Sequence, residues 1–286
     1  MAGNRNDFYR TLTAAVADLV EHGFDSQERL DEWLERIHAA ARAALVSERV
    51  LQRSLADALT RVFRRATSPG QVARRHRGVS QFTLQQIAPR LRAELDRRIL
   101  ASANLIKLNR EQSIARTLQR FAGWASSIPA GGTEVAKREK AKKDIRRGIA
   151  GLPYEERRVV IDQGAKLAAG LDDIIATDGG AIAGVWHHVP EGPPAYAARP
   201  QHVSRNGKVY LLRDSWAQKD GLVKAGAAGY TDEITQPGEE VFCRCRYVFL
   251  YNLRDLPPAM LTVKGRATLA EARAKIRDSE RHLHAQ

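Results

Sequence analysis

The two cysteines of this chain lie two residues apart, toward its C-terminal end. Cys243 and Cys245 flank an arginine in the run Gly238–Pro257. Valine and aromatic residues are frequent in this run, and Pro-Gly and Pro-Pro pairs bound it, a pattern that predicts a β-strand. Because residues i and i+2 of a strand share a face, both thiols are expected to point the same way. Two thiolates on one face supply half of a tetrahedral zinc site.

A histidine earlier in the sequence is the best candidate for a third metal ligand. It is His202, and either His188 or Asp232 is a candidate for the fourth position. These residue types suggest a structural zinc ion, although most structural zinc sites use C-x2-C or longer spacing. The alternative is that Cys243 and Cys245 are small buried residues, with His202 hydrogen-bonded nearby. A disulfide between these two neighbours is poorly placed geometrically.

Catalytic chemistry has weaker support. The sequence contains no G-x-S-x-G, P-loop, H-E-x-x-H or G-x-G-x-x-G motif. The acidic pairs 172–173 and 239–240 are sequence neighbours, whose side chains point apart on a helix or a strand and so make poor acid–base pairs. A nucleophilic Cys243 activated by His202 is conceivable. We expect a protein that is not an enzyme.

The candidate site residues need a scaffold, and its first part is a long region, residues 1–178, that is predicted to be helical. Apolar residues recur there at helical spacing, in segments over 8–20, 30–45, 47–66, 79–123, 133–149 and 154–175. Ser68-Pro69-Gly70 and Gly151-Leu152-Pro153 are expected to separate helices, and Pro89 to mark a boundary or a kink. The segments together predict a helical bundle.

The composition changes at residues 177–180. Residues 179–258 are rich in glycine, proline and aromatic side chains, and Asn206-Gly207 predicts a tight turn ahead of a strand over 209–212. Residues 259–286 form the third region, with a final helix expected from about Thr262 to His282. The predicted fold class is α+β: a mainly helical N-terminal region, a small loop-rich module that contains β-strands, and a terminal helix.

Basic residues exceed acidic ones. The chain has 46 Lys and Arg against 33 Asp and Glu, a formal net charge of +13. Such an excess suggests a polyanionic partner, either nucleic acid or an acidic protein surface. The densest basic patch is the candidate DNA-binding surface and would contact phosphates without sequence preference. Its members are Lys137, Arg138, Lys140, Lys142, Lys143, Arg146 and Arg147. The alternative is that this patch is a solvated helix face.

The remaining signals concern the compartment. The first ten residues lack the apolar region of a signal peptide, and no run has the length and apolarity of a membrane span. Two cysteines do not make a disulfide framework, so a reducing cytosol is the expected compartment.

Several of these segments together resemble a known family. Trp186, Arg199–His202, Asn206-Gly207 and the run from Pro237 to Cys245 are similar to the signature of phage Mu protein F-like minor head proteins. The resemblance covers roughly residues 155–250, and the helical region ahead of it also resembles the family's layout. The segment from His187 to Ala198 is longer than the family's common spacing.

This resemblance implies a structural minor capsid or head morphogenesis protein of a tailed bacteriophage. Its expected place is the virion, near the portal vertex, and the host cytoplasm during assembly. The expected partners are portal and capsid proteins and, without sequence preference, double-stranded DNA, with no membrane. The cysteine pair would then hold together a module with little core of its own. Two alternatives stay open: a zinc-containing nucleic-acid-binding or nucleic-acid-processing protein of the cytosol, and a cytosolic DNA-binding protein unrelated to virions.

Overall fold

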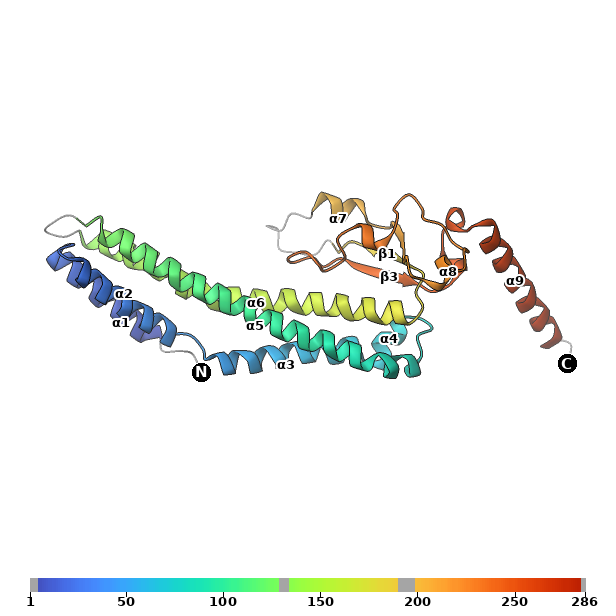
Figure 1. The fold of residues 1–286 in the computed structure, drawn as a ribbon, viewed down its shortest axis with the longest axis horizontal. Helices are drawn as coiled ribbons and strands as arrows, with labels where there is room; N and C mark the ends of the chain where they lie inside the picture. The colour runs from blue at the N-terminus through green and yellow to red at the C-terminus, as the bar shows by residue number, and fades with distance from the viewer. Residues whose placement is uncertain (1–4, 129–133, 190–198, 284–286) are drawn as a thin grey trace. The chain divides into compact units, whose positions relative to one another are not determined.

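The computed structural model describes residues 5–128, 134–189 and 199–283, and most of its helices and strands are labelled in Figure 1. The chain forms two compact units, and each combines segments that are distant in the sequence. The first unit comprises Met1–Ala58 and Arg98–Ile161, and the second comprises Leu59–Arg97 and Asp162–Gln286. The sequence predicted three consecutive domains, and that division stays a prediction. The two compact units divide the chain in another way, since each unit joins segments that are not consecutive.

The first unit is helical and has its own apolar core. It contains α1 (Arg5–His22), α2 (Gln27–Ala43), the C-terminal part of α5 (Gln81–Ala125) and the N-terminal part of α6 (Val135–Asp178). The apolar residues recur at helical spacing, so each helix turns one stripe inward. The largest buried side chains are Phe8, Leu12, Leu19, Ile37, Phe121, Ile145 and Ile149.

Proline has a different effect at each of three positions. Pro69 is the first residue of α4 (Pro69–Arg75), which follows α3 (Glu48–Ala66). Proline is favoured at a helix start because the N–H that it lacks would have no partner there. Pro89 lies inside α5, and Pro153 lies inside α6. The expectation of separate helices over 133–149 and 154–175 was therefore wrong.

Packing explains why α6 continues through its proline. Proline removes one hydrogen bond from a helix interior, which is a local cost. Ile149 and Leu152, on the preceding turns, are almost fully buried in the core of the first unit. Most helical stability in proteins comes from such burial, so one missing hydrogen bond does not end the helix.

The second unit contains a three-stranded antiparallel sheet in the order β2-β1-β3. The strands are β1 (Ala183–His187), β2 (Val209–Leu211) and β3 (Arg246–Leu250), and Trp186 on β1 is opposite Tyr247 on β3. Trp186, Tyr247 and Phe249 belong to one buried cluster. A Cβ added at Gly184 would lie 2.8 Å from the Tyr247 ring, so this strand position requires glycine.

The second unit also contains α4, parts of α3, α5 and α6, several short helices and a long terminal helix. The short helices are α7 (Pro200–Ser204), α8 (Trp216–Lys219) and the 3-10 turns Thr231–Glu233, Leu253–Asp255 and Pro258–Met260. The terminal helix is α9 (Val263–Leu283). The α+β prediction is confirmed: a mostly helical N-terminal region precedes a small antiparallel sheet and a final helix. Across the described ranges, every helix is too short or too polar to span a membrane.

A buried polar cluster joins α4, α6 and the residue that follows β3. His76 Nδ1 lies 2.8 Å from the Tyr251 hydroxyl, and His76 Nε2 lies 3.2 Å from Asp172 Oδ1. Arg75 forms an ion pair with the other oxygen of Asp172 at 2.5 Å. Both His76 and Asp172 are buried, so this cluster fixes the helices of the second unit to its sheet.

Candidate metal centre

Cys243 and Cys245 lie just before a strand rather than on it. Strand β3 begins at Arg246, so the expectation that both cysteines share a strand face was wrong. The backbone φ is +82° at Gly238 and +59° at Phe242. A left-handed residue cannot continue an extended strand, so the chain turns through this segment and enters the ladder only afterwards.

Hydrogen bonds close this turn and attach it to α6. The Cys243 N–H donates to the Glu240 carbonyl at 3.1 Å, and the Gly238 N–H donates to Cys243 Sγ at 3.4 Å. The Phe242 N–H donates to Asp162 Oδ1, on α6, at 2.6 Å. The turn therefore aims the Cys243 sulfur inward and satisfies the backbone donors of Gly238, Phe242 and Cys243.

The structure brings His202 to both sulfurs. This residue lies on α7, and its Nδ1 is 3.5 Å from Cys243 Sγ and 3.7 Å from Cys245 Sγ. The exposed fractions of His202, Cys243 and Cys245 are 2%, 3% and 6%. One ligand atom from each lies within 4.8 Å of the other two. Both interpretations of the cysteines, metal ligation and apolar packing, agree with this burial.

The two candidates for a fourth ligand differ sharply in position. His188 directly follows β1, is half-buried, and has its Nδ1 3.5 Å from Cys245 Sγ. It lies at one edge of the group, since its ligand atoms are not within 4.8 Å of all three others. Asp232 is exposed and forms an ion pair with Arg213 at 2.8 Å, apart from the cysteines. Only His188 therefore stays a candidate.

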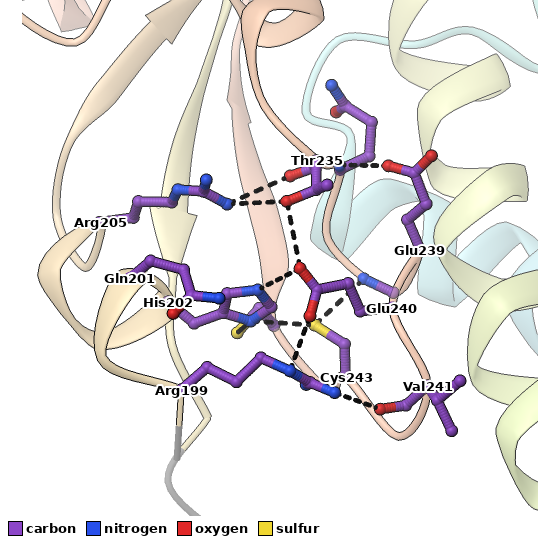
Figure 2. A network of polar contacts seen from close by, with 12 residues as sticks. Arg199, Gln201, His202, Arg205, Thr235, Glu239, Glu240, Val241 and Cys243 are labelled. Carbon is purple, nitrogen blue, oxygen red and sulfur yellow. Dashed lines mark hydrogen bonds and ion pairs between the residues drawn. The ribbon is translucent and has the colours of Figure 1, made fainter.

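The outer edge of the His202 ring faces a carboxylate (Figure 2). His202 Nε2 lies 3.3 Å from Glu240 Oε1, and Glu240 Oε2 accepts from Arg199 Nε at 2.6 Å. Thr235 donates to Glu240 at 3.5 Å and accepts from Arg205 at 3.1 Å. A carboxylate at Nε2 assigns the ring proton to that nitrogen and leaves the Nδ1 lone pair directed at the sulfurs.

The two thiols have opposite proton affinities. The pKa of Cys243 is lowered to about 5, chiefly by a hydrogen bond from Cys245 and, against the effect of burial, by the Gly238 N–H. The same hydrogen bond, together with burial, raises the pKa of Cys245 above its usual range. The pair therefore loses one proton readily, and the resulting thiolate disfavours loss of the second.

Trp186 forms a wall of the site. Its ring is fully buried and lies edge-on to the His202 ring, with 5.4 Å between the ring centroids. The Arg205 guanidinium lies 5.1 Å from the centre of the indole. The buried indole N–H contacts the Cys245 thiol. Trp186 thus closes the site with a largely apolar surface.

The basic patch lies on the part of α6 that belongs to the first unit, and its side chains point to different faces of that helix. Lys140, Lys143 and Arg147 are exposed, and successive residues of a helix are about 100° apart, so these three lie opposite the buried Ile145 and Ile149.

The other basic side chains of the patch have intramolecular roles. Lys142 forms an ion pair with Glu139, and Lys137 lies 3.6 Å from Glu134. Arg146 lies over the Tyr9 ring at 5.5 Å, and the half-buried Arg138 also has an interaction partner. An exposed stripe of three basic side chains therefore stays available for a polyanion.

Sequence reasoning missed the partners that orient the site. Arg199 occurs in the Arg-Pro-x-His segment, which singled out the histidine, but nothing in the spacing connected Arg199 to Glu240. The cluster of His76, Asp172 and Tyr251 gave no sequence signal, because its members come from three distant segments.

Comparison with protein-family models, curated proteins and solved structures finds no match for this chain. The resemblance to minor head proteins therefore rests on the motif residues themselves.

Proposed function

We propose that this chain is a structural minor head protein of a tailed bacteriophage. It acts in head morphogenesis, where its partners are portal and capsid proteins and packaged DNA. One observation carries the proposal. Residues of the motif that are far apart in sequence meet in one cluster: Trp186, Arg199, His202 and the Cys243–Cys245 segment.

Each segment of the motif makes a contact, or adopts a backbone conformation, that helps to hold this cluster together. Trp186 packs on His202, and Arg199 holds the carboxylate that contacts His202. Asn206 Oδ1 accepts from the His188 N–H at 2.9 Å, and Gly207 adopts a φ of +77°, which few other residues tolerate. A chance similarity of composition does not require such mutual contacts, so they support the resemblance.

The burial of the reactive groups favours a structural role over catalysis. Cys243, Cys245 and His202 are at most 6% exposed, and closed sites of this kind stabilise folds, whereas catalytic zinc sites keep an open position. Long helices supply surface for protein partners. On α5, Leu100 and Leu108 are 64% and 55% exposed, so part of that surface is apolar.

The exposed basic stripe supports a position beside DNA. Lys140, Lys143 and Arg147 project from α6 where phosphates would be accessible. Arg147 also lines a surface pocket of about 380 Å³ with Arg120 and Trp124. These side chains bind a polyanion without reading its bases, as expected of a protein that lies against packaged DNA.

Mass spectrometry of purified phage particles and procapsids tests the proposal. The protein is expected in both at low copy number relative to the major capsid protein. A tagged copy carrying His202→Ala is expected to enter particles less than a tagged copy carrying His187→Ala, since His187 is exposed on β1. Absence of the protein from particles and procapsids alike would contradict the proposal.

A further inference from the structure

The donor atoms around His202 already have the spacing of zinc ligands. Around a tetrahedral zinc ion with Zn–S bonds of about 2.3 Å and Zn–N bonds of about 2.0–2.1 Å, a nitrogen and a sulfur lie about 3.6 Å apart. The distances from His202 Nδ1 to the two sulfurs are 3.5 Å and 3.7 Å. The His202 nitrogen therefore lies at ligand separation from both sulfurs, and all three donor atoms lie within 4.8 Å of one another.

A fourth nitrogen lies at the same separation from one sulfur. His188 Nδ1 is 3.5 Å from Cys245 Sγ, which matches the nitrogen–sulfur distance across a zinc ion. The backbone N–H of His188 is held by Asn206 Oδ1 at 2.9 Å, so the start of this side chain is fixed. For His188 to complete a tetrahedron, its half-buried ring would have to rotate about its side-chain bonds so that Nδ1 approaches the other donors.

We propose that Cys243, Cys245, His202 and His188 bind one zinc ion, with His188 as the ligand that closes the tetrahedron. Two thiolates and two imidazoles in tetrahedral geometry select zinc rather than magnesium or calcium, which take oxygen ligands. The four residues come from three segments: the end of β1, helix α7 and the turn before β3. One ion therefore ties helix α7 to the paired strands β1 and β3.

Glu240 is a positioning residue for this site. Zinc-bound histidines typically donate their second N–H to a carboxylate, which fixes the ring and its tautomer. Glu240 contacts His202 in this way, and Arg199 and Thr235 hold Glu240 in turn. Simple apolar packing of the cysteines requires neither a carboxylate at Nε2 nor a histidine nitrogen directed at both sulfurs.

The first experiment measures zinc in the purified full-length protein by elemental analysis. About one zinc per chain is expected, and replacement by Co2+ should give the intense visible bands of a tetrahedral site together with thiolate charge-transfer bands. A protein that purifies without zinc and does not bind added zinc overturns the proposal, whatever its role in phage heads.

A second experiment identifies the fourth ligand with variants that leave the core intact. Zinc affinity of His188→Ala is expected to fall at least about 10-fold, because even loss of an outer-shell partner costs 10- to 100-fold. His187→Ala and Asp232→Asn are the matched controls and should bind zinc like the wild type. If His188→Ala also binds like the wild type, His188 is not a ligand.

A third measurement tests the positioning role. Glu240→Gln is expected to weaken zinc binding by about 10- to 100-fold while the cobalt spectrum keeps its tetrahedral bands. Glu239→Gln is the matched control, since among the residues that the structure describes Glu239 accepts from the Gln236 N–H, whereas His202 contacts Glu240. Equal zinc affinity of the two variants would rule out the role of Glu240.

Discussion

Glu240 holds the outer edge of the His202 ring, with 3.3 Å between Oε1 and Nε2, while the opposite edge of that ring faces Cys243 Sγ at 3.5 Å. The histidine is therefore fixed from both sides, and its lone pair is directed into the buried cluster. This relationship connects a short helix to the turn before β3 and explains how a loop-rich segment keeps one conformation.

Removal of zinc should destabilise the second unit. Bound zinc stabilises the folded state by about 4 kcal/mol when free zinc exceeds the dissociation constant 1,000-fold. A chelator should therefore lower the melting temperature measured by calorimetry, and added zinc should restore it. The double variant Cys243→Ala/Cys245→Ala is the control and should not respond to chelator. A wild-type melting temperature that ignores both reagents would contradict the zinc site.

The same site should release its metal in acid. Protons compete with zinc for thiolate and imidazole, so zinc affinity falls as the pH falls. Titration from neutral pH downward, followed with a zinc-sensitive dye, should show release together with a loss of melting temperature. A zinc content independent of pH would show that the metal is held by other ligands.

The turn that carries the cysteines should depend on Gly238. Its φ is +82°, and an added Cβ would lie 2.8 Å from the Ala169 Cβ on α6. Gly238→Ala is expected to lower the unfolding free energy by about 1–3 kcal/mol more than Gly207→Ala, because overpacking adds to backbone strain. Gly207 has a φ of +77° and open space around it, which makes it the matched control. Equal losses in denaturant titrations would mean that contact with α6 contributes nothing.

The sequence predicted which residues of the site meet but not how they meet. Cys243, Cys245 and His202 were chosen because of their chemistry, and the structure places them together. The assumed cause, a shared strand face, was wrong, since Phe242 turns the chain with a positive φ that no local pattern indicated. Glu240 and Arg199 were missed because their pairing depends on the tertiary approach of α7 to the turn.

Helix positions were easier to predict than helix ends. Apolar periodicity located α1, α2, α3 and α5, because burial of one stripe determines each of them. Pro153 was misinterpreted as a boundary, since the cost of a proline is local and the burial of Ile149 and Leu152 is tertiary. A segment over 129–133, where a loop and the start of a helix were expected, lies outside the described residues.

The buried cluster at His76 should contribute more stability than an exposed ion pair. Asp172→Asn removes the charge that faces Arg75 and His76, and loss of one partner from a buried pair costs about 3–5 kcal/mol. Asp178→Asn is the control, because its partner Arg90 is largely exposed and such pairs contribute at most about 1 kcal/mol. Urea titrations should show this order. If Asp172→Asn lowers the unfolding free energy no more than the control does, the cluster at His76 does not contribute more stability than an exposed ion pair.

The exposed stripe of α6 should determine DNA binding. Replacing Lys140, Lys143 and Arg147 with Gln should weaken DNA affinity and flatten the slope of log affinity against log salt by up to about 3, since each lost phosphate contact removes about 0.9. The matched control changes the same number of charges at Arg138, Lys142 and Arg146, which are paired, stacked or half-buried. Equal slopes for the two variants would mean that only net charge attracts DNA.

The most direct test of the proposed function is the position of this protein in the particle. Cryo-electron microscopy of virions, reconstructed without imposed icosahedral symmetry, should show density for a tagged copy at one vertex, beside the portal. Antibody labelling of the tag should mark the same vertex in procapsids. Density spread evenly over the shell, or no labelled density in either particle, would contradict a minor head protein that acts near the portal.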